Sequence, residues 1–264
     1  MISIATTYFN RKTQFINTLK SLTLSRVKDF ELIAVDDCSD EEERIEDLEK
    51  DFSFLKVYRI GEEEKRFNNP CIAFNLAFSK CSGDTIIIQN AECFHYTDIL
   101  HAVREKISED KYLSLACYSI DQETTERISI DFLNSFKTIN FLPRRQDING
   151  LNGWYNHGLY RPTGLHFCSA ISRKNLIKLN GFDERYAEGS CFDDNEFLHR
   201  IGVLGLKIIF ENEQVSVHQY HPNFNYHKPN ISAMEHANQN LYRNTTLKEN
   251  IYKANPLKSI LKEI

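Results

Sequence analysis

The sequence is poor in several residue types, and these scarcities exclude some classes of protein and some kinds of site. It has one tryptophan, two methionines and ten glycines among 264 residues. Its seven cysteines are scattered and form no Cys-x-x-Cys pair, so we expect reduced thiols in a cytosolic setting and no zinc site. Neither an internal repeat nor a low-complexity linker is apparent, which favours one large domain with or without an extension.

Long apolar runs and an excess of basic charge are also missing. No apolar stretch approaches the roughly 20 residues of a membrane span. The chain opens with the strand-like segment Met1–Ala5 and shows no signal peptide. The formal net charge of −5 gives no indication of a nucleic-acid binder. We therefore expect a cytoplasmic, soluble globular protein.

Strand-like and helix-like segments alternate through the first ninety residues. The predicted strands are Ile2–Thr6, Phe30–Val35, Leu55–Ile60 and Asp84–Ile88, and the predicted helices are Thr13–Leu24, Asp40–Phe52 and Ile72–Ser79. This alternation predicts an α/β fold with a mainly parallel sheet flanked by helices on both faces. Ligands bind outside the carboxyl ends of the strands in such sheets.

Polar side chains follow three of the predicted strands at their carboxyl ends. They are Thr6, Thr7, Asn10 and Arg11 after the first strand, Asp36 and Asp37 after the second, and Asn90 and Glu92 after the fourth. One such group could be an ordinary turn. Three groups at one edge of one sheet are expected to converge on a cleft.

A second polar feature lies in the segment Asn180–Ile201. Phe197 and Ile201 have the spacing of an apolar helix face, and Asp193 and Asp194 would lie at the N-terminus of that helix. The helix macrodipole favours negative charge there, so both acids could simply cap the helix. The alternative is that one of them is a general base facing the cleft.

Several short segments, in collinear order over about residues 1–221, resemble family 2 glycosyltransferases. They are Thr6–Arg11, Val35–Ser39, Asn75, Gly83–Glu92, Gly181–Glu184, Asp193–Phe197 with Arg200, and Val217-His218. The resemblance implies a glycosyltransferase A-type (GT-A) fold that binds a nucleotide-diphospho sugar. It divides the chain into a catalytic domain, 1–221, with a donor-nucleotide half, 1–95, and an acceptor half, 96–221. Residues 222–264 would form a C-terminal helical extension.

The resemblance also implies roles for individual residues. Asp194 would be the general base and Asp193 would contact the acceptor, while Asp36 or Asp37 would bind the uracil and ribose of a UDP-sugar. Further donor contacts would come from Thr6, Tyr8, Asn10, Arg11, Arg66, Asn75 and Asn90.

Mn²⁺ or Mg²⁺ would be held by Glu92, Asn90 and His218, with His221 as the rival histidine ligand. The family usually has Asp-x-Asp where this chain has Asn90-Ala91-Glu92. Asn90 offers a neutral oxygen in place of a carboxylate, so metal binding is expected to be weaker. Either histidine could instead be an ordinary hydrogen-bonded residue.

Residues in the middle of the chain are expected to bind the acceptor. Trp154, bracketed by Gly153 and Gly158 in a predicted loop, suits stacking on a sugar face, although it could equally be packed at the edge of the core. Tyr155 and Asp183 are the other predicted substrate contacts.

The C-terminal segment carries an apolar stripe with lysines around it. The stripe consists of Leu247, Ile251, Ala254, Leu257, Leu261 and Ile264. A basic amphipathic helix of this kind could lie on an anionic membrane, as in polysaccharide-assembling enzymes, or dock on the catalytic domain, a partner or a second copy.

These features predict an inverting, metal-dependent glycosyltransferase that acts on a glycan or glycoconjugate acceptor. The alternative is a catalytically weak homologue that binds a nucleotide sugar or glycan. A sugar-phosphate nucleotidyltransferase is disfavoured, because Ala5–Arg11 contains no glycine for a phosphate-binding loop.

Overall fold

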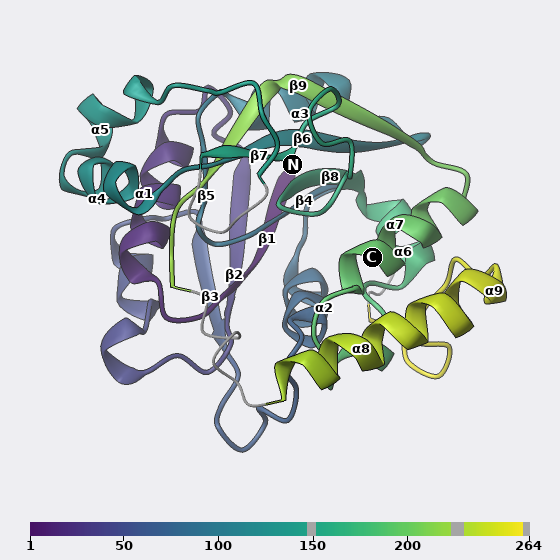
Figure 1. Ribbon diagram of the computed structural model, residues 1–264. Coiled ribbons are helices and arrows are strands. Elements are labelled where there is room, and N and C mark those ends of the chain that lie inside the picture. Colours follow the sequence, from purple (N-terminus) through teal and green to yellow (C-terminus); the bar gives the residue numbers. More distant parts are fainter. Residues whose placement is uncertain (147–151, 223–229, 261–264) are drawn as a thin grey trace.

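A computed structural model describes residues 1–146, 152–222 and 230–260 (Figure 1). Within these residues nine strands form one sheet, in the order β3-β2-β1-β4-β8-β6-β9-β5, with β7 paired to β6. The strands are β1 (Ile2–Tyr8), β2 (Phe30–Asp36), β3 (Leu55–Arg59), β4 (Thr85–Gln89), β5 (Cys93–His95), β6 (Lys111–Ser119), β7 (Gly153–Asn156), β8 (Cys168–Ser172) and β9 (Lys207–His218).

Helices flank this sheet on both sides, as the view in Figure 1 shows. They are α1 (Lys12–Thr23), α2 (Cys71–Lys80), α3 (Ile99–Lys106), α4 (Gln122–Ile130), α5 (Phe132–Ser135), α6 (Arg173–Leu179), α7 (Asp193–Val203), α8 (Ile231–Leu241) and α9 (Leu247–Glu249). The α/β fold class predicted from the sequence is confirmed.

The two halves of the sheet differ in strand direction. Strand β1 runs parallel to both β2 and β4, and β2 runs parallel to β3. Beyond β4 the sheet is mixed, because β8 is antiparallel to β4 and β6, whereas β6 and β9 are parallel. The parallel half therefore contains the four predicted N-terminal strands, and their carboxyl ends share one edge.

Successive residues of β4 lie in two apolar layers, one on each face of the sheet. Ile86 and Ile88 of β4 lie in the layer that packs against α2, α6 and α7, where Phe197 is buried. Ile87, between them, lies in the opposite layer with α1 and α3. This alternation follows from the two-residue repeat of a strand and fixes β4 at the centre of the molecule.

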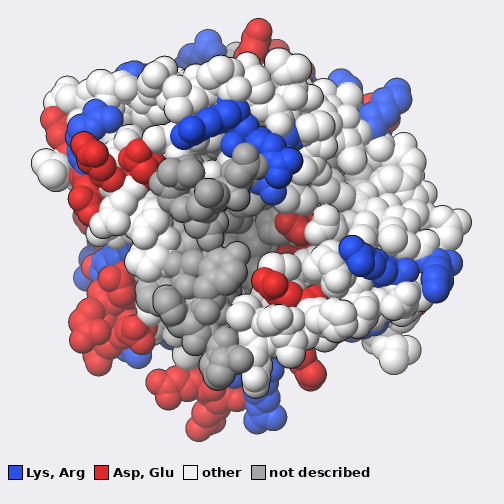
Figure 2. Space-filling view, viewed as in Figure 1, with Lys and Arg blue, Asp and Glu red and all other residues white. Residues whose placement is uncertain are grey.

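The predicted helix over Asp40–Phe52 is wrong. The segment forms two short 3₁₀ helices, η1 (Glu41–Glu43) and η2 (Glu46–Lys50), separated by the extended residue Arg44. Glu43 accepts a hydrogen bond of 2.8 Å from the Lys12 backbone nitrogen, so this acid is drawn to the start of α1. Figure 2 shows acidic side chains gathered on this flank, at the lower left of the view.

The C-terminal segment is also not the helix that the apolar stripe predicted. After α8 and a π-helical turn, η6 (Tyr242–Thr246), helix ends with α9, and residues 250–260 are irregular. Ala254 and Ile260 are buried against the α/β fold, whereas Leu257 is fully exposed. Leu261 and Ile264 lie outside the described residues. Docking on the α/β fold therefore accounts for the buried members of the stripe.

No helix among the described residues combines the length and apolar character required to cross a membrane.

Asn180, directly after α6, anchors the C-terminal segment and is expected to be important for stability. Its backbone is left-handed, with φ of 59°, and its side-chain amide is buried. Its Nδ2 donates to the backbone oxygens of Ala254, Asn255 and Lys258 at 2.9, 3.1 and 2.7 Å, and its Oδ1 accepts from the nitrogen of Ile260 at 2.8 Å.

We expect Asn180→Ala to lower the free energy of unfolding by about 2–4 kcal/mol, because it leaves several buried backbone groups unpaired. Asn250→Ala is the matched control: Asn250 is also left-handed, with φ of 49°, but is exposed. It should lose only the local backbone preference, about 1 kcal/mol. Urea unfolding of both variants measures the difference, and equal losses would contradict the anchoring role.

Candidate active site

An open cavity of about 710 Å³ lies at the carboxyl ends of β1, β2 and β4. It is lined by residues from all three predicted polar groups and from the start of α7. The predicted site residues among them are Tyr8, Asn10, Arg11, Asp37, Asn90, Glu92, Tyr155, Asp193, Asp194, His218 and His221. The convergence of the three polar groups on one cleft is therefore confirmed.

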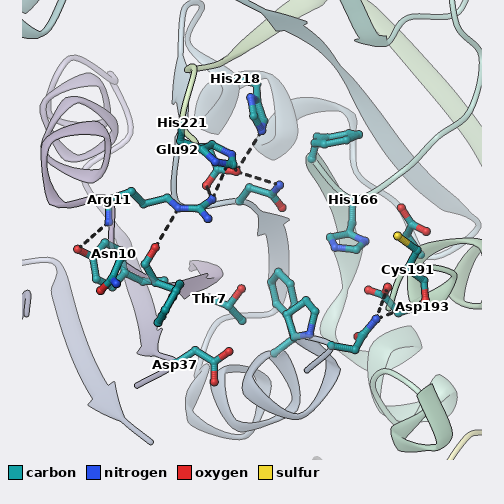
Figure 3. Close-up of a pocket in the computed structure, with 18 of the residues that line it drawn as sticks. Thr7, Asn10, Arg11, Asp37, Glu92, His166, Cys191, Asp193, His218 and His221 are labelled. Carbon is teal, nitrogen blue, oxygen red and sulfur yellow. Dashed lines mark hydrogen bonds and ion pairs between the residues drawn. The ribbon is translucent and has the colours of Figure 1, made fainter. Parts of the chain in front are cut away.

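A carboxylate and two imidazoles form a cluster on one side of this cavity (Figure 3). Nε2 of His218 lies 3.1 Å and Nε2 of His221 3.4 Å from the same oxygen of Glu92, Oε1. One potential ligand atom from each residue falls within 4.8 Å of the others. His218 and His221 are thus not rivals for one place, because both reach Glu92.

Arg11 completes this cluster from the start of α1. Its Nη1 lies 2.7 Å from Oε2 of Glu92. Burial opposes ionisation of Glu92, but Arg11 and the two histidines outweigh it and hold the pKa of Glu92 well below its ordinary value. Burial lowers the pKa of His218, against the pull of Glu92. The cluster is a buried anion held among cationic and neutral donors.

The donor set of this cluster fits a divalent cation. One carboxylate and two imidazoles are suitable ligands for a transition metal such as Mn²⁺. Asn90, the other predicted ligand, turns its Nδ2 toward Oε1 of Glu92 at 3.3 Å and so presents a donor to the cluster. The structure therefore supplies Glu92, His218 and His221 as the set that would hold a metal.

Both acids of the predicted pair line the cavity, and Asp193 lies across it from this cluster (Figure 3). Oδ1 of Asp193 accepts a hydrogen bond of 2.7 Å from the side chain of Asn69. Oδ1 of Asp194 accepts one of 2.8 Å from the backbone nitrogen of Asn195. Withdrawal from water and the neighbouring charge of Asp193 raise the pKa of Asp194 to about 6. A carboxylate of this kind is ionised at neutral pH and accepts a proton more readily than an ordinary aspartate.

The backbone before the acid pair is strained. Cys191 and Phe192 are consecutive left-handed residues, with φ of 59° and 65°. Non-glycine residues in this conformation cost about 1–3 kcal/mol each and concentrate at functional sites. Asn238 of α8 supports the turn by donating to the backbone oxygen of Cys191 at 2.9 Å. The C-terminal segment therefore helps to hold α7 with its N-terminus at the cavity.

The two neighbouring aspartates after β2 have different roles in the structure. Asp36 is fully buried, pairs with Nη1 of Arg59 at 3.0 Å and accepts from the Ser39 nitrogen at 2.9 Å. Asp37 lines the cavity and pairs with Nζ of Lys65 at 2.5 Å. Of the two predicted nucleotide contacts, only Asp37 is placed to meet a ligand in this cavity.

Other predicted site residues lie outside the cavity lining. Thr6 is buried within β1, and Arg66 faces a separate shallow pocket. Asn75 is buried and donates to the backbone oxygen of Phe182 at 3.0 Å. Asp183 is buried and pairs with Arg185 at 2.7 Å. Asn75 and Asp183 are turned inward because each satisfies a nearby backbone or charged group, whereas Arg66 is exposed.

Trp154 lies in a strand where the sequence predicted an exposed loop. It is 5% exposed and packs in an aromatic cluster with Tyr118 and Phe141. The alternative of a tryptophan at the core edge is thus the observed one. Tyr155, its neighbour in β7, points to the other side of the sheet, lines the cavity and stacks on Phe167 with 4.6 Å between ring centroids.

Among the cavity residues that the sequence analysis missed, three contact or adjoin predicted site residues. Asn69 holds Asp193, Lys65 pairs with Asp37, and His166 lines the wall near the acid pair. Asn69 precedes Pro70 at the start of α2, a local signal for a helix boundary. His166 and Lys65 carry no comparable signal in the sequence.

Comparison with protein-family models identifies the family to which this chain belongs. The model described as glycosyl transferase family 2 matches residues 3–177, well over half of the chain. The chain therefore belongs to glycosyl transferase family 2. A search of curated proteins finds no match.

Solved structures share the GT-A fold with this chain. A mannosyltransferase from Pyrobaculum calidifontis, PcManGT with GDP-Man and Mn²⁺, is 16% identical with a TM-score of 0.52, covering 82% of this chain and 56% of its own. Residues 1–349 of S. aureus TarS with UDP-GlcNAc are 15% identical with a TM-score of 0.60, covering 84% and 59%. GalNAc-T7 with UDP, GalNAc and Mn²⁺ is 16% identical with a TM-score of 0.59, covering 84% and 44%.

This chain thus spans about half the length of these solved chains.

Proposed function

We propose that the protein is an inverting glycosyltransferase that moves a sugar from a nucleotide-diphospho sugar to a glycan or glycoconjugate acceptor. One observation carries this proposal. A single cavity at the carboxyl ends of the parallel strands brings the Asp193–Asp194 pair opposite the cluster of Glu92, His218 and His221. A base on one side and an anion-neutralising group on the other are what in-line displacement at an anomeric carbon needs.

In this proposal the carboxylate of Asp194 removes the proton from an acceptor hydroxyl. The acceptor oxygen then forms a bond to the anomeric carbon as the bond from that carbon to the diphosphate oxygen breaks, which inverts the configuration. Asp193, fixed by Asn69, positions the acceptor. When bound, a divalent cation would neutralise the negative charge that develops on the departing diphosphate.

The donor is proposed to lie between the ends of β1 and β2. Asp37 is suited to accept hydrogen bonds from the base or ribose of a nucleotide, while Lys65 and Arg11 supply positive charge for the diphosphate. UDP is the proposed nucleotide, in line with the UDP ligands of TarS and GalNAc-T7, whereas PcManGT holds GDP-Man. Imidazole ligands favour Mn²⁺ over Mg²⁺.

Calorimetric titration of UDP, GDP and CDP, each with and without Mn²⁺, tests this proposal. We expect UDP to bind most tightly and only UDP binding to strengthen with Mn²⁺. Turnover assays with UDP-sugars would follow. Tight binding of GDP instead would change the donor but keep the transferase. Absence of nucleotide binding under every condition would remove the transferase proposal.

A catalytically weak nucleotide-sugar binder is the second candidate, and one observation favours it. Asn90 stands where the family usually has a carboxylate, and it presents its Nδ2 to Glu92. Nucleotide binding without transfer or hydrolysis of any UDP- or GDP-sugar would select this candidate. The raised pKa of Asp194 and the strained turn before it favour the catalytic alternative.

A further inference from the structure

Arg11 occupies the place that a metal ion would need in the carboxylate–histidine cluster. Its Nη1 lies 2.7 Å from Oε2 of Glu92 and 3.3 Å from Nε2 of His221, two of the three potential ligands. Its Nε donates to the backbone oxygen of Phe9 at 3.0 Å, which holds the guanidinium in this position. Figure 3 shows the side chain reaching across the cavity edge to Glu92.

Two cations cannot share this position. A metal ion binds its ligands at about 2–2.5 Å, and the three ligand atoms lie within 4.8 Å of one another. Nη1 of Arg11 contacts Oε2 of Glu92 and Nε2 of His221, so it lies next to the position that a metal held by Oε1 and the two imidazoles would take. Two positive charges this close would also repel each other strongly in a partly buried site. Metal binding thus requires Arg11 to leave Glu92.

The rest of the cluster is arranged for a resident guanidinium. Glu92 is 3% exposed, and a buried carboxylate without a cation is costly. His218 directs Nε2 at Oε1 of Glu92, where an N–H donor is favourable and a metal-binding lone pair is not. Nε2 of His221 lies 3.3 Å from Nη1 of Arg11, while its Nδ1 faces the backbone oxygen of Pro222 at 3.1 Å, so Nε2 is placed to accept from the guanidinium. Nδ1 of His218 has no hydrogen-bond partner among the described residues. For His218, therefore, none of the described residues supplies the acceptor that usually fixes the ligating tautomer of a metal-bound histidine.

We propose that Arg11 is a built-in competitor of the divalent cation, which keeps the cluster closed until an anionic donor draws the guanidinium away. Arg11 also lines the cavity, so a diphosphate can offer it an alternative partner. Metal and nucleotide then assist each other, because each favours the arrangement in which Arg11 has left Glu92. This second consequence rests on the proposed function, whereas the competition between Arg11 and the metal does not.

The competition is tested by titrating Mn²⁺ into nucleotide-free protein. We expect Arg11→Gln to bind Mn²⁺ roughly 10- to 100-fold more tightly than wild type, because a nearby positive charge has been removed. Lys65→Gln is the matched control, since it removes an equal charge from the same cavity but from the partner of Asp37. The Mn²⁺ affinity of Lys65→Gln should stay within about 3-fold of wild type, because solvent screens charges that lie farther from the metal site.

Equal Mn²⁺ affinity in wild type and Arg11→Gln, or the same gain in Lys65→Gln, would overturn the proposal. A second measurement does not depend on the glutamine variant. With Arg11→Ala, millimolar methylguanidinium should compete with Mn²⁺, whereas wild type should show no such competition. Lack of competition in Arg11→Ala would also count against the proposal.

The coupling between Mn²⁺ and UDP separates this inference from the proposed function. In wild type, Mn²⁺ should strengthen UDP binding, and in Arg11→Gln this enhancement should shrink toward the direct metal–diphosphate contribution. Tighter Mn²⁺ binding by Arg11→Gln without any UDP binding would retain the competition and refute the proposed donor. An undiminished enhancement in Arg11→Gln would refute the role of Arg11 in coupling.

Discussion

Replacing Asp194 with asparagine is expected to lower the rate of sugar transfer by about 10²- to 10⁴-fold, the usual contribution of a general base. Asparagine keeps the shape of the side chain but cannot accept the acceptor's proton at neutral pH. UDP affinity should be nearly unchanged, because the proposed role of Asp194 is to act on the acceptor and not on the nucleotide. Steady-state kinetics and calorimetry on the same variant measure both quantities. Near-normal turnover would show that Asp194 only caps α7.

The pH dependence of transfer gives an independent check on this assignment. The base must be ionised, so transfer should fall as the pH drops through about 6, the raised pKa of Asp194. The charge of Asp193 contributes to that increase, so Asp193→Asn should move the acidic limb of the pH–rate profile to lower pH. Asparagine can still accept the hydrogen bond from Asn69, which makes this variant a matched control. An unshifted limb would mean that another group is titrating.

The raised pKa of Asp194 also determines how this residue affects the stability of the folded protein as the pH changes. Because the folded-state pKa of Asp194 is above its ordinary value of 3.8, its contribution to stability is fully present below about 3.8 and lost as the pH rises through about 6. At pH 8 the ionised side chain is therefore unfavourable in the folded state. Asp194→Asn should then be at least as stable as wild type at pH 8, and this advantage should vanish near pH 4.

Replacing Glu92 with glutamine is expected to abolish the metal dependence of nucleotide binding. The carboxylate is the only anionic ligand of the proposed set, and its loss should weaken Mn²⁺ binding by roughly 100-fold or more, beyond the effect typical of residues that merely support a ligand. Glutamine keeps an oxygen that can accept from the surrounding donors, so the packing around position 92 is largely retained. Mn²⁺ titration and UDP titration with and without Mn²⁺ provide the measurement.

Asp37→Asn is the control for this experiment. Asp37 is a second carboxylate of the same cavity, but it pairs with Lys65 and is separate from the cluster of Glu92 and the histidines. Its replacement should weaken UDP binding equally with and without Mn²⁺. If Glu92→Gln retained wild-type metal dependence while Asp37→Asn lost it, the proposed metal site would be in the wrong place.

Much of the N-terminal part of the fold could be predicted from the sequence. Strands β1 to β4 are short, largely apolar runs and helices α1 and α2 carry apolar residues at helical spacing, so these residues have little alternative to burial. The direction of the parallel strands then brings Asp37, Asn90 and Glu92 to one edge. The helix that residue spacing predicted over Asp40–Phe52 does not form, because acidic side chains of this segment bind the start of α1 and Arg59.

The acceptor side and the detailed roles depended on contacts between distant parts of the chain. The sequence alone determined the four N-terminal strands, the family and the acidic pair at a helix start. Only the tertiary structure decided that Asp36 pairs with Arg59 while Asp37 faces the cavity, that Trp154 is buried, and that Arg11 lies between Glu92 and His221. Sequence periodicity reports which face of an element is apolar, whereas the partner of a buried charge depends on side chains brought together from segments up to 210 residues apart.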